Sequence, residues 1–216
     1  MQPHVFLDLD GNLTESGIGI TRSIAHALTE LGVAVPEQSV LDSMIGPSLW
    51  EIFSRLGLPE NQLDDAVALY RARYTTVGLF ENKLYDGVIE MLEALSSAGC
   101  TLCLATAKPL AYASRITAHF AITPYLAQEF GSELDGTRTD KADLIAYALA
   151  KTGADPARSF MMGDRDKDVI GALANDVTPI GALWGYGSLA ELSDAGCTLN
   201  AAAPAEAARM ILERLP

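Results

Sequence analysis

The chain has 216 residues, 49% of them apolar, which suits one globular domain with an insertion or two small domains. Its formal net charge of −13 argues against nucleic acid or an anionic membrane surface as a partner. Three cysteines are too few for a disulfide framework, and we find neither a leader-like start nor an apolar run near the roughly 20 residues of a membrane span. We therefore expect a cytoplasmic protein.

The first predicted strand runs directly into two carboxylates. Residues 4–7 favour extended chain, and Asp8 and Asp10 follow two positions apart, before Gly11. Side chains at positions i and i+2 of extended chain point the same way, and buried acids are costly unless a cation holds them. The stretch therefore predicts a strand that delivers a pair of carboxylates to a metal ion and an electrophile.

Helical periodicity dominates the next seventy or so residues. Apolar residues recur three or four positions apart over residues 20–31 and again over residues 63–77, and Gly32 ends the first of these runs. Proline and glycine punctuate the stretch between the two runs, and we find no convincing strand from about residue 16 to residue 84. The sequence therefore predicts an all-helical insert after the first strand, which we place at residues 16–85.

From Tyr85 onward, strand and helix patterns alternate. The predicted strands cover residues 101–105, 128–131, 159–162 and 178–183, and the predicted helices cover residues 88–95, 109–120, 140–151, 166–175 and 204–215. Such alternation predicts an α/β fold with a Rossmann-like parallel sheet flanked by helices. Residues 1–15 and 86–216 would form this core.

Polar residues stand at the ends of later predicted strands. Thr106 follows the second strand, Lys141 opens a helix, and Asp164 follows a further strand with Asp168 four residues on. The carboxyl ends of parallel strands meet at one edge of a sheet. We therefore expect these four side chains to lie beside the first pair of carboxylates.

The order of these residues resembles the haloacid dehalogenase superfamily of phosphohydrolases. The shared pattern is D-x-D-G near the N-terminus, a Thr after the next strand, a lone Lys and then G-D-x-x-x-D. The helical insert resembles the cap domain of that family, which implies a part in substrate specificity. Three segments are similar to its phosphoglycolate phosphatase and 5′-nucleotidase branch, namely Gly46-Pro47-Ser48, Tyr85-Asp86-Gly87 and Trp184-Gly185-Tyr186-Gly187.

The resemblance implies a role for each acid. Asp8 would attack phosphorus and form an aspartyl phosphate, while Asp10 would protonate the leaving oxygen and then activate water. Two unit charges about 4 Å apart interact by roughly 4 kcal/mol at an effective dielectric near 20, so converging acids and a phosphate need a divalent cation. The resemblance implies that Asp8, the carbonyl of Asp10 and Asp164 bind Mg²⁺, with Asp168 helping directly or through water.

Other residues would bind the phosphoryl group or the rest of the substrate. Thr106, Lys141 and the backbone N–H of Ala107 are the expected phosphate ligands, together with Asn12, which stands where the family usually has Thr. In the insert, Gly46 and three arginines, Arg22, Arg71 and Arg73, are candidate substrate contacts, although most arginines on helices are simply solvated. We expect Trp50 to fill the core of the insert.

These expectations predict a Mg²⁺-dependent phosphomonoesterase that acts on a small soluble metabolite, either phosphoglycolate or a nucleoside 5′-monophosphate. A phosphoglucomutase-like phosphoryl transferase is an alternative, because it would use the same phosphorylated intermediate. A receiver-like phospho-accepting module also uses Asp, Thr and Lys, but its acceptor follows the acid pair along the chain, and it has no insert. The sequence leaves open whether the protein is a monomer or a dimer.

Overall fold

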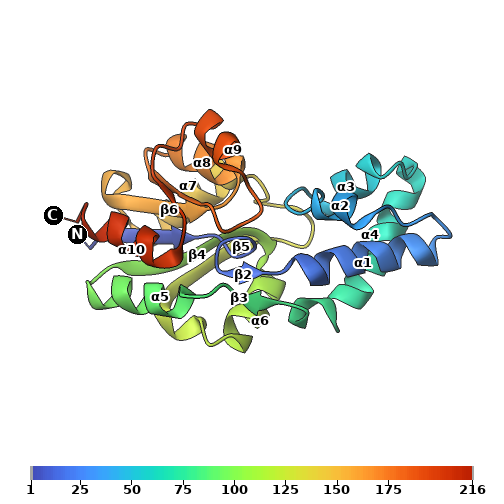
Figure 1. Ribbon diagram of the computed structural model, residues 1–216, viewed down its shortest axis with the longest axis horizontal. Helices are drawn as coiled ribbons and strands as arrows, with labels where there is room; N and C mark the ends of the chain where they lie inside the picture. Colours follow the sequence, from blue (N-terminus) through green and yellow to red (C-terminus); the bar gives the residue numbers. More distant parts are fainter. Residues whose placement is uncertain (1, 216) are drawn as a thin grey trace. The chain divides into compact units, whose positions relative to one another are not determined.

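The computed structural model describes residues 2–215, which group into two compact units (Figure 1). The described residues up to Glu15 and from Leu84 onward form one unit, and Ser16–Lys83 forms the other. Within residues 2–215, no helix combines the length and the apolar character needed to cross a membrane.

A six-stranded sheet forms the centre of the first unit. Its strands are β1 (His4–Leu7), β4 (Thr101–Pro109), β5 (Leu126–Ser132), β6 (Ser159–Gly163), β7 (Thr178–Ala182) and β8 (Asn200–Ala201), in the spatial order β5-β4-β1-β6-β7-β8. Neighbouring strands run parallel, and Leu7 lies opposite both Leu104 and Met162. The carboxyl ends of β1, β4 and β6 therefore lie side by side. The predicted parallel α/β sheet is confirmed.

Helices cover both faces of this sheet. Figure 1 shows α7 (Lys141–Thr152) and α8 (Asp166–Leu173) on one side of the strands, and α5 (Val88–Ser97) and α6 (Leu110–His119) on the other. The remaining helices of the unit are α9 (Leu189–Asp194), α10 (Pro204–Leu212) and the 3-10 turns η2 (Thr123–Tyr125) and η3 (Pro156–Arg158). Because helices pack on both faces, β1 is buried from Val5 to Leu7, which explains its continuous apolar run.

The second unit is built of helices. They are α1 (Gly17–Glu30), α2 (Gln38–Asp42), α3 (Leu49–Arg55), α4 (Glu60–Tyr74) and the 3-10 turn η1 (Gly78–Phe80). Their core contains the buried side chains of Ile24, Leu28, Phe53, Val67 and Tyr74. A Cβ at Gly19 would overlap the carbonyl of Gly78, so glycine lets α1 and η1 approach closely. Two short strands, β2 (Thr14–Glu15) and β3 (Lys83–Leu84), form a separate sheet.

Several features of the fold differ from the sequence prediction. The short strand β3 lies at the end of the stretch from about residue 16 to residue 84, where no strand was predicted, and two residues are too few to show a strand pattern. Strand β4 continues four residues past its predicted end and includes Pro109, which the sequence had placed at the start of a helix. Proline is tolerated there because it lies at the strand end beside an irregularity in the β4–β5 pairing. Helix α9 and strand β8 were missed, because segments of six and two residues are too short to show a periodic pattern.

Candidate active site

A tight turn carries the chain out of β1. The backbone N–H of Asp8 donates to the carbonyl of Met162, and the N–H of Gly11 donates to the carbonyl of Thr14, both at 2.9 Å. Gly11 has a φ of +80°, and a Cβ at this position would overlap the carboxylate of Asp164. A residue without a side chain is therefore required where this turn passes the end of β6.

Three carboxylates from different parts of the chain converge beside this turn. Asp8 follows β1, Asp164 follows β6, and Asp168 lies in the first turn of α8. All three are buried, and one carboxylate oxygen from each lies within 4.8 Å of those of the others. The parallel register brings these strand ends together, and the sequence pattern indicated the same edge of the sheet.

The surroundings of this acidic cluster disfavour negative charge. Burial, followed by the neighbouring Asp168 and Asp8, raises the pKa of Asp164 to about 8. Burial also raises the pKa of Asp168 to about 6, although Lys141 opposes this rise. The Oδ1 atom of Asp164 is buried without a hydrogen-bond partner among the described residues. A set of carboxylate oxygens with an unsatisfied acceptor suits a hard divalent cation such as Mg²⁺.

Lys141 supplies a buried positive charge to the same cluster. Its Nζ atom lies 2.7 Å from Oδ1 of Asp168 and 3.0 Å from Oδ1 of Asp8, and it donates to the carbonyl of Ala105 at 3.1 Å. Burial alone would lower the pKa of Lys141, but Asp168 and Asp8 outweigh it and raise the pKa above the ordinary value. The ammonium group therefore stays charged and offsets part of the negative charge.

The other predicted phosphate ligands lie on β4 and on the turn after β1. Thr106 is buried, and its hydroxyl accepts from the N–H of Lys108 at 3.3 Å. The carbonyl of Ala107 accepts from the hydroxyl of Ser132 at 2.8 Å. Asn12 is fully buried and donates from Nδ2 to the carbonyl of Asp8 at 3.0 Å, so its amide group braces the turn. Their binding of phosphate stays a prediction.

Comparison with known proteins identifies the family. A family model described as haloacid dehalogenase-like hydrolase matches residues 5–182, which include the acidic cluster, Lys141 and the helical unit. The chain belongs to this family. The predicted assignment, and with it the prediction of a phosphatase of this family, is confirmed at the level of the family.

Three similar proteins place this hydrolase within its family. A 5′-nucleotidase of Pseudomonas aeruginosa is 44% identical over 88% of the chain and 86% of its own length. The tyrosine-protein kinase PtkA of Mycobacterium tuberculosis is 40% identical over 85% of the chain, which spans only 62% of that protein. A solved haloacid dehalogenase-like family hydrolase of Streptococcus pneumoniae, SP0104, is 30% identical and superposes with a TM-score of 0.91, covering 97% of the chain and 98% of its own.

Sequence reasoning missed a second lysine in the site of this hydrolase. Lys108 donates from Nζ to Oδ2 of Asp10 at 2.5 Å, and only 7% of its side chain is exposed. The sequence Lys108-Pro109 is typical of a helix start, so the sequence pattern does not predict Lys108 as a residue of the site. Its position two residues after Thr106 on extended chain would have indicated that both side chains point the same way.

A glycine-rich loop after β7 supports the turn and Asp164. Trp184 donates from Nε1 to the carbonyl of Asn12 at 2.9 Å, and the N–H of Tyr186 donates to Oδ2 of Asp164 at 2.7 Å. A Cβ at Gly187 would overlap the carbonyl of Asp164. The motif that resembles the family's phosphatase branch therefore orients an acid of the cluster.

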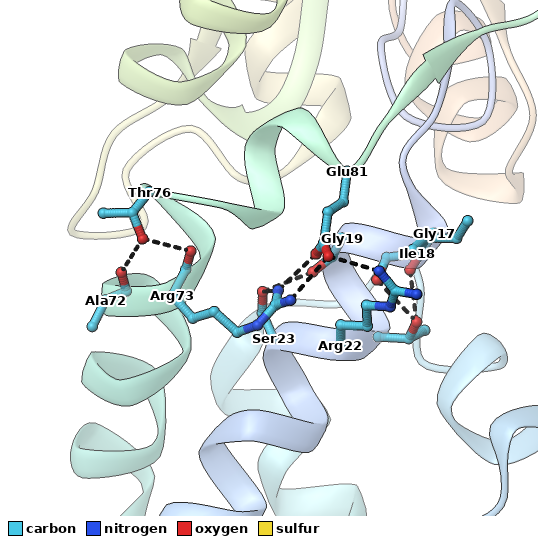
Figure 2. Close-up of polar contacts among 10 residues, drawn as sticks. Gly17, Ile18, Gly19, Arg22, Ser23, Ala72, Arg73, Thr76 and Glu81 are labelled. Atoms are coloured by element: carbon cyan, nitrogen blue, oxygen red, sulfur yellow. Dashed lines mark hydrogen bonds and ion pairs between the residues drawn. The ribbon is translucent and has the colours of Figure 1, made fainter.

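The helical unit uses two of its predicted substrate arginines to bind an internal carboxylate. Figure 2 shows Arg22 of α1 and Arg73 of α4 converging on Glu81, which follows η1. Arg22 and Arg73 each approach the Glu81 carboxylate to 2.8 Å, and Arg73 also donates to the hydroxyl of Ser23 at 3.1 Å. The hydrogen bond from Arg73, the largest influence, holds the pKa of Glu81 below its usual value. A substrate contact by either arginine stays a prediction.

The third arginine lies elsewhere on the helical unit. Arg71 lies over the ring of Trp50, with 5.3 Å from its guanidinium carbon to the ring centroid, and Trp50 donates from Nε1 to Asp64 at 2.9 Å. The expectation that Trp50 fills the core is wrong, because its ring is only half-buried between polar neighbours. Gly46, with a φ of +122°, lies in the exposed turn between α2 and α3.

The Glu81 cluster makes a stability prediction. We expect Arg73→Met to lower the free energy of unfolding by about 1–3 kcal/mol, because it leaves a largely buried carboxylate without its main donor. Arg22→Met should change that free energy by less than about 1 kcal/mol, since its ion pair is solvent-exposed. Urea unfolding at pH 7 measures both variants. The ion pair contributes above the unfolded pKa of Glu81, so the effect of Arg73→Met should fade as the pH falls below 4.5, the ordinary pKa of Glu81. Equal losses in the two variants would contradict this assignment.

Proposed function

We propose that this family member is a Mg²⁺-dependent phosphomonoester hydrolase that works through an aspartyl phosphate on Asp8. The observation that carries the proposal is the buried triad of Asp8, Asp164 and Asp168, with carboxylate oxygens within 4.8 Å of one another. The raised pKa of Asp164 supports a bound cation, because burial and the neighbouring acids oppose its negative charge and extra positive charge would favour the ionised form. Asp8, Asp164 and the carbonyl of Asp10 would hold Mg²⁺, with Asp168 directly or through water, and the ion would supply that positive charge.

The residues of the site divide a two-step reaction between them. In the first step a carboxylate oxygen of Asp8 forms a bond to phosphorus, the bond to the leaving oxygen breaks, and Asp10 donates a proton to that oxygen. In the second step the oxygen of a water molecule forms a bond to phosphorus while Asp10 takes its proton, the bond between phosphorus and Asp8 breaks, and phosphate leaves. Lys141, at 3.0 Å from Asp8, would balance the charge of the nucleophile and of the phosphoryl oxygens.

The preferred substrate in this proposal is a nucleoside 5′-monophosphate. The 44% identical relative named 5′-nucleotidase supports this choice, and phosphoglycolate is the alternative that the sequence resemblance suggests. We further propose that the enzyme works in the cytoplasm on a small metabolite, without nucleic acid or membrane partners, in keeping with its net charge of −13.

A phosphate-release screen tests the proposal. Purified protein is incubated with nucleoside 5′-monophosphates, nucleoside 3′-monophosphates, phosphoglycolate and sugar phosphates, with Mg²⁺ and after removal of divalent ions by a chelator. We expect steady release of phosphate from the 5′-monophosphates, loss of at least about 100-fold on chelation, and recovery when Mg²⁺ is restored. Phosphate release that is unaffected by chelation would refute the metal-dependent mechanism.

Phosphoryl transfer is a second candidate, favoured by the 40% identical relative named tyrosine-protein kinase. It would begin with the same phosphorylated Asp8, and the acceptor in the second step would be a hydroxyl group instead of water. Product analysis after incubation with a donor ester and either a tyrosine peptide or a sugar phosphate distinguishes the two outcomes. A single stoichiometric burst of the alcohol product, with the phosphoryl group retained on the protein and no turnover, would instead indicate a receiver-like module.

A further inference from the structure

The contact between Lys108 and Asp10 places a second buried cation in the site. The Nζ atom of Lys108 donates to Oδ2 of Asp10 at 2.5 Å, and 21% of the Asp10 side chain is exposed compared with 7% of Lys108. The other oxygen of the carboxyl group, Oδ1 of Asp10, is buried and has no hydrogen-bond partner among the described residues. Lys108 therefore holds one oxygen of Asp10 and leaves the second one available.

The two lysines of the site bind different acids. Lys141 lies against Asp8 and Asp168, on the side of the proposed nucleophile and metal ligands. Lys108 lies against Asp10, the proposed proton donor to the leaving oxygen. The side chains of both lysines are largely buried, so each interaction is stronger than an ion pair at the protein surface. The positive charge of Lys108 is consequently placed on the leaving-group side of the reaction.

We propose that Lys108 is a positioning residue for Asp10, which holds Oδ2 of the carboxyl group so that Oδ1 can exchange a proton with the leaving group. This inference rests on the proposed function. As the bond between phosphorus and the ester oxygen breaks, the proton of Asp10 passes to that oxygen, an alcohol leaves, and the negative charge remains on Asp10. Lys108 holds Oδ2 of Asp10 in place throughout this step, so the carboxyl group needs no reorganisation before the proton is transferred.

This role makes the contribution of Lys108 depend on the leaving group. An alkoxide, such as the 5′-oxygen of a nucleoside, is a poor leaving group and needs the proton. A p-nitrophenolate departs as a stable anion and needs it far less. A residue that only maintained the fold, or only bound the phosphoryl group, would affect both esters alike.

The test compares two esters in three variants. Lys108→Met removes the ammonium group but keeps the length of the side chain, Lys108→Arg keeps the charge, and Lys151→Met is a control at an exposed lysine of α7. We expect Lys108→Met to lower kcat/KM by about 100-fold for a nucleoside 5′-monophosphate and by less than about 5-fold for p-nitrophenyl phosphate, because acid catalysis contributes about 10²–10⁴-fold where a proton is required. The 5′-monophosphate loss should appear in kcat more than in KM. Lys108→Arg should recover part of the kcat/KM that Lys108→Met loses on the 5′-monophosphate. Lys151→Met should match the wild type on both esters.

Four results would overturn the inference. Equal losses on both esters would show that Lys108 supports the site as a whole. A rise in KM alone, on both esters, would make it a phosphate ligand. An equal loss on both esters in Lys108→Arg would likewise overturn the inference, even if Lys108→Met fails to fold. A wild-type protein that releases phosphate from neither ester would refute the proposed function and this inference with it, so the two failures are distinguishable.

Discussion

Asp8→Asn is expected to lower kcat for phosphate release by at least about 1,000-fold, because an amide cannot form the covalent intermediate on which both steps depend. The substitution is nearly isosteric, and it removes one negative charge from a cluster in which Asp164 and Asp168 already have raised pKa values. Lys141 keeps Asp168 as a partner at 2.7 Å, so the metal-free variant should still fold. The comparison is made with a nucleoside 5′-monophosphate at saturating Mg²⁺, alongside thermal unfolding of both proteins.

The matched control for Asp8→Asn is Asp65→Asn, at an exposed position of α4. The control should keep wild-type kcat, which separates loss of the nucleophile from a general effect of reduced charge. Acid-quenched wild-type enzyme should also carry one phosphoryl group on the peptide that contains Asp8, as seen by mass spectrometry. An Asp8→Asn variant that retains more than about a tenth of the rate would place the nucleophile elsewhere.

The acidic cluster could be predicted from the sequence because carboxylates are rare next to buried strands. Asp8 and Asp164 directly follow buried strands, where carboxylates are costly, and strand order in a parallel sheet fixes which ends meet. Residue type and local pattern were therefore sufficient to bring them together. The sheet could also be predicted, because a strand that is buried on both faces, as β1 is, requires an uninterrupted apolar run.

The ion pairs of the site and of the helical unit could not be predicted from the sequence pattern. Lys108 is adjacent to a proline that resembles a helix start, and its contact with Asp10 depends on how far β4 extends. Glu81 lies outside every helix, so periodicity gives it no partner, and its pairing with Arg73 follows from the packing of η1 against α1 and α4. Side-chain contacts between segments distant in sequence depend on the three-dimensional approach of those segments. Local pattern carries little of that information.

Asp164→Asn is expected to make the metal-free protein more stable at pH 8 while it abolishes the response to Mg²⁺. Burial and then the neighbouring acids raise the pKa of Asp164 from 3.8 to about 8 in the folded state. The folded state therefore binds this proton more tightly than the unfolded state does, and the free energy of unfolding falls as the pH rises from about 4 to about 8. Asparagine does not ionise, so the variant loses this contribution to the pH dependence.

Thermal unfolding of chelated protein between pH 4 and pH 8 measures the effect. Relief of even about 2 kcal/mol at pH 8 would raise the midpoint of unfolding by about 4–8 °C for a chain of this size. Asp194→Asn, at an exposed position of α9, is the control and should follow the wild-type pH dependence.

Addition of Mg²⁺ should make the wild type more stable than Asp164→Asn. A cation that binds only the folded state stabilises the wild type by about 2.7 kcal/mol at a concentration of 100 times its Kd, and this gain should be absent or much smaller in Asp164→Asn. The negative charge of Asp164 therefore lowers the free energy of unfolding when the ion is absent. When the ion is present, the same charge contributes to its binding and so stabilises the folded state. A wild-type protein whose unfolding midpoint does not respond to Mg²⁺, or an Asp164→Asn variant that responds equally, would contradict a metal site at this cluster.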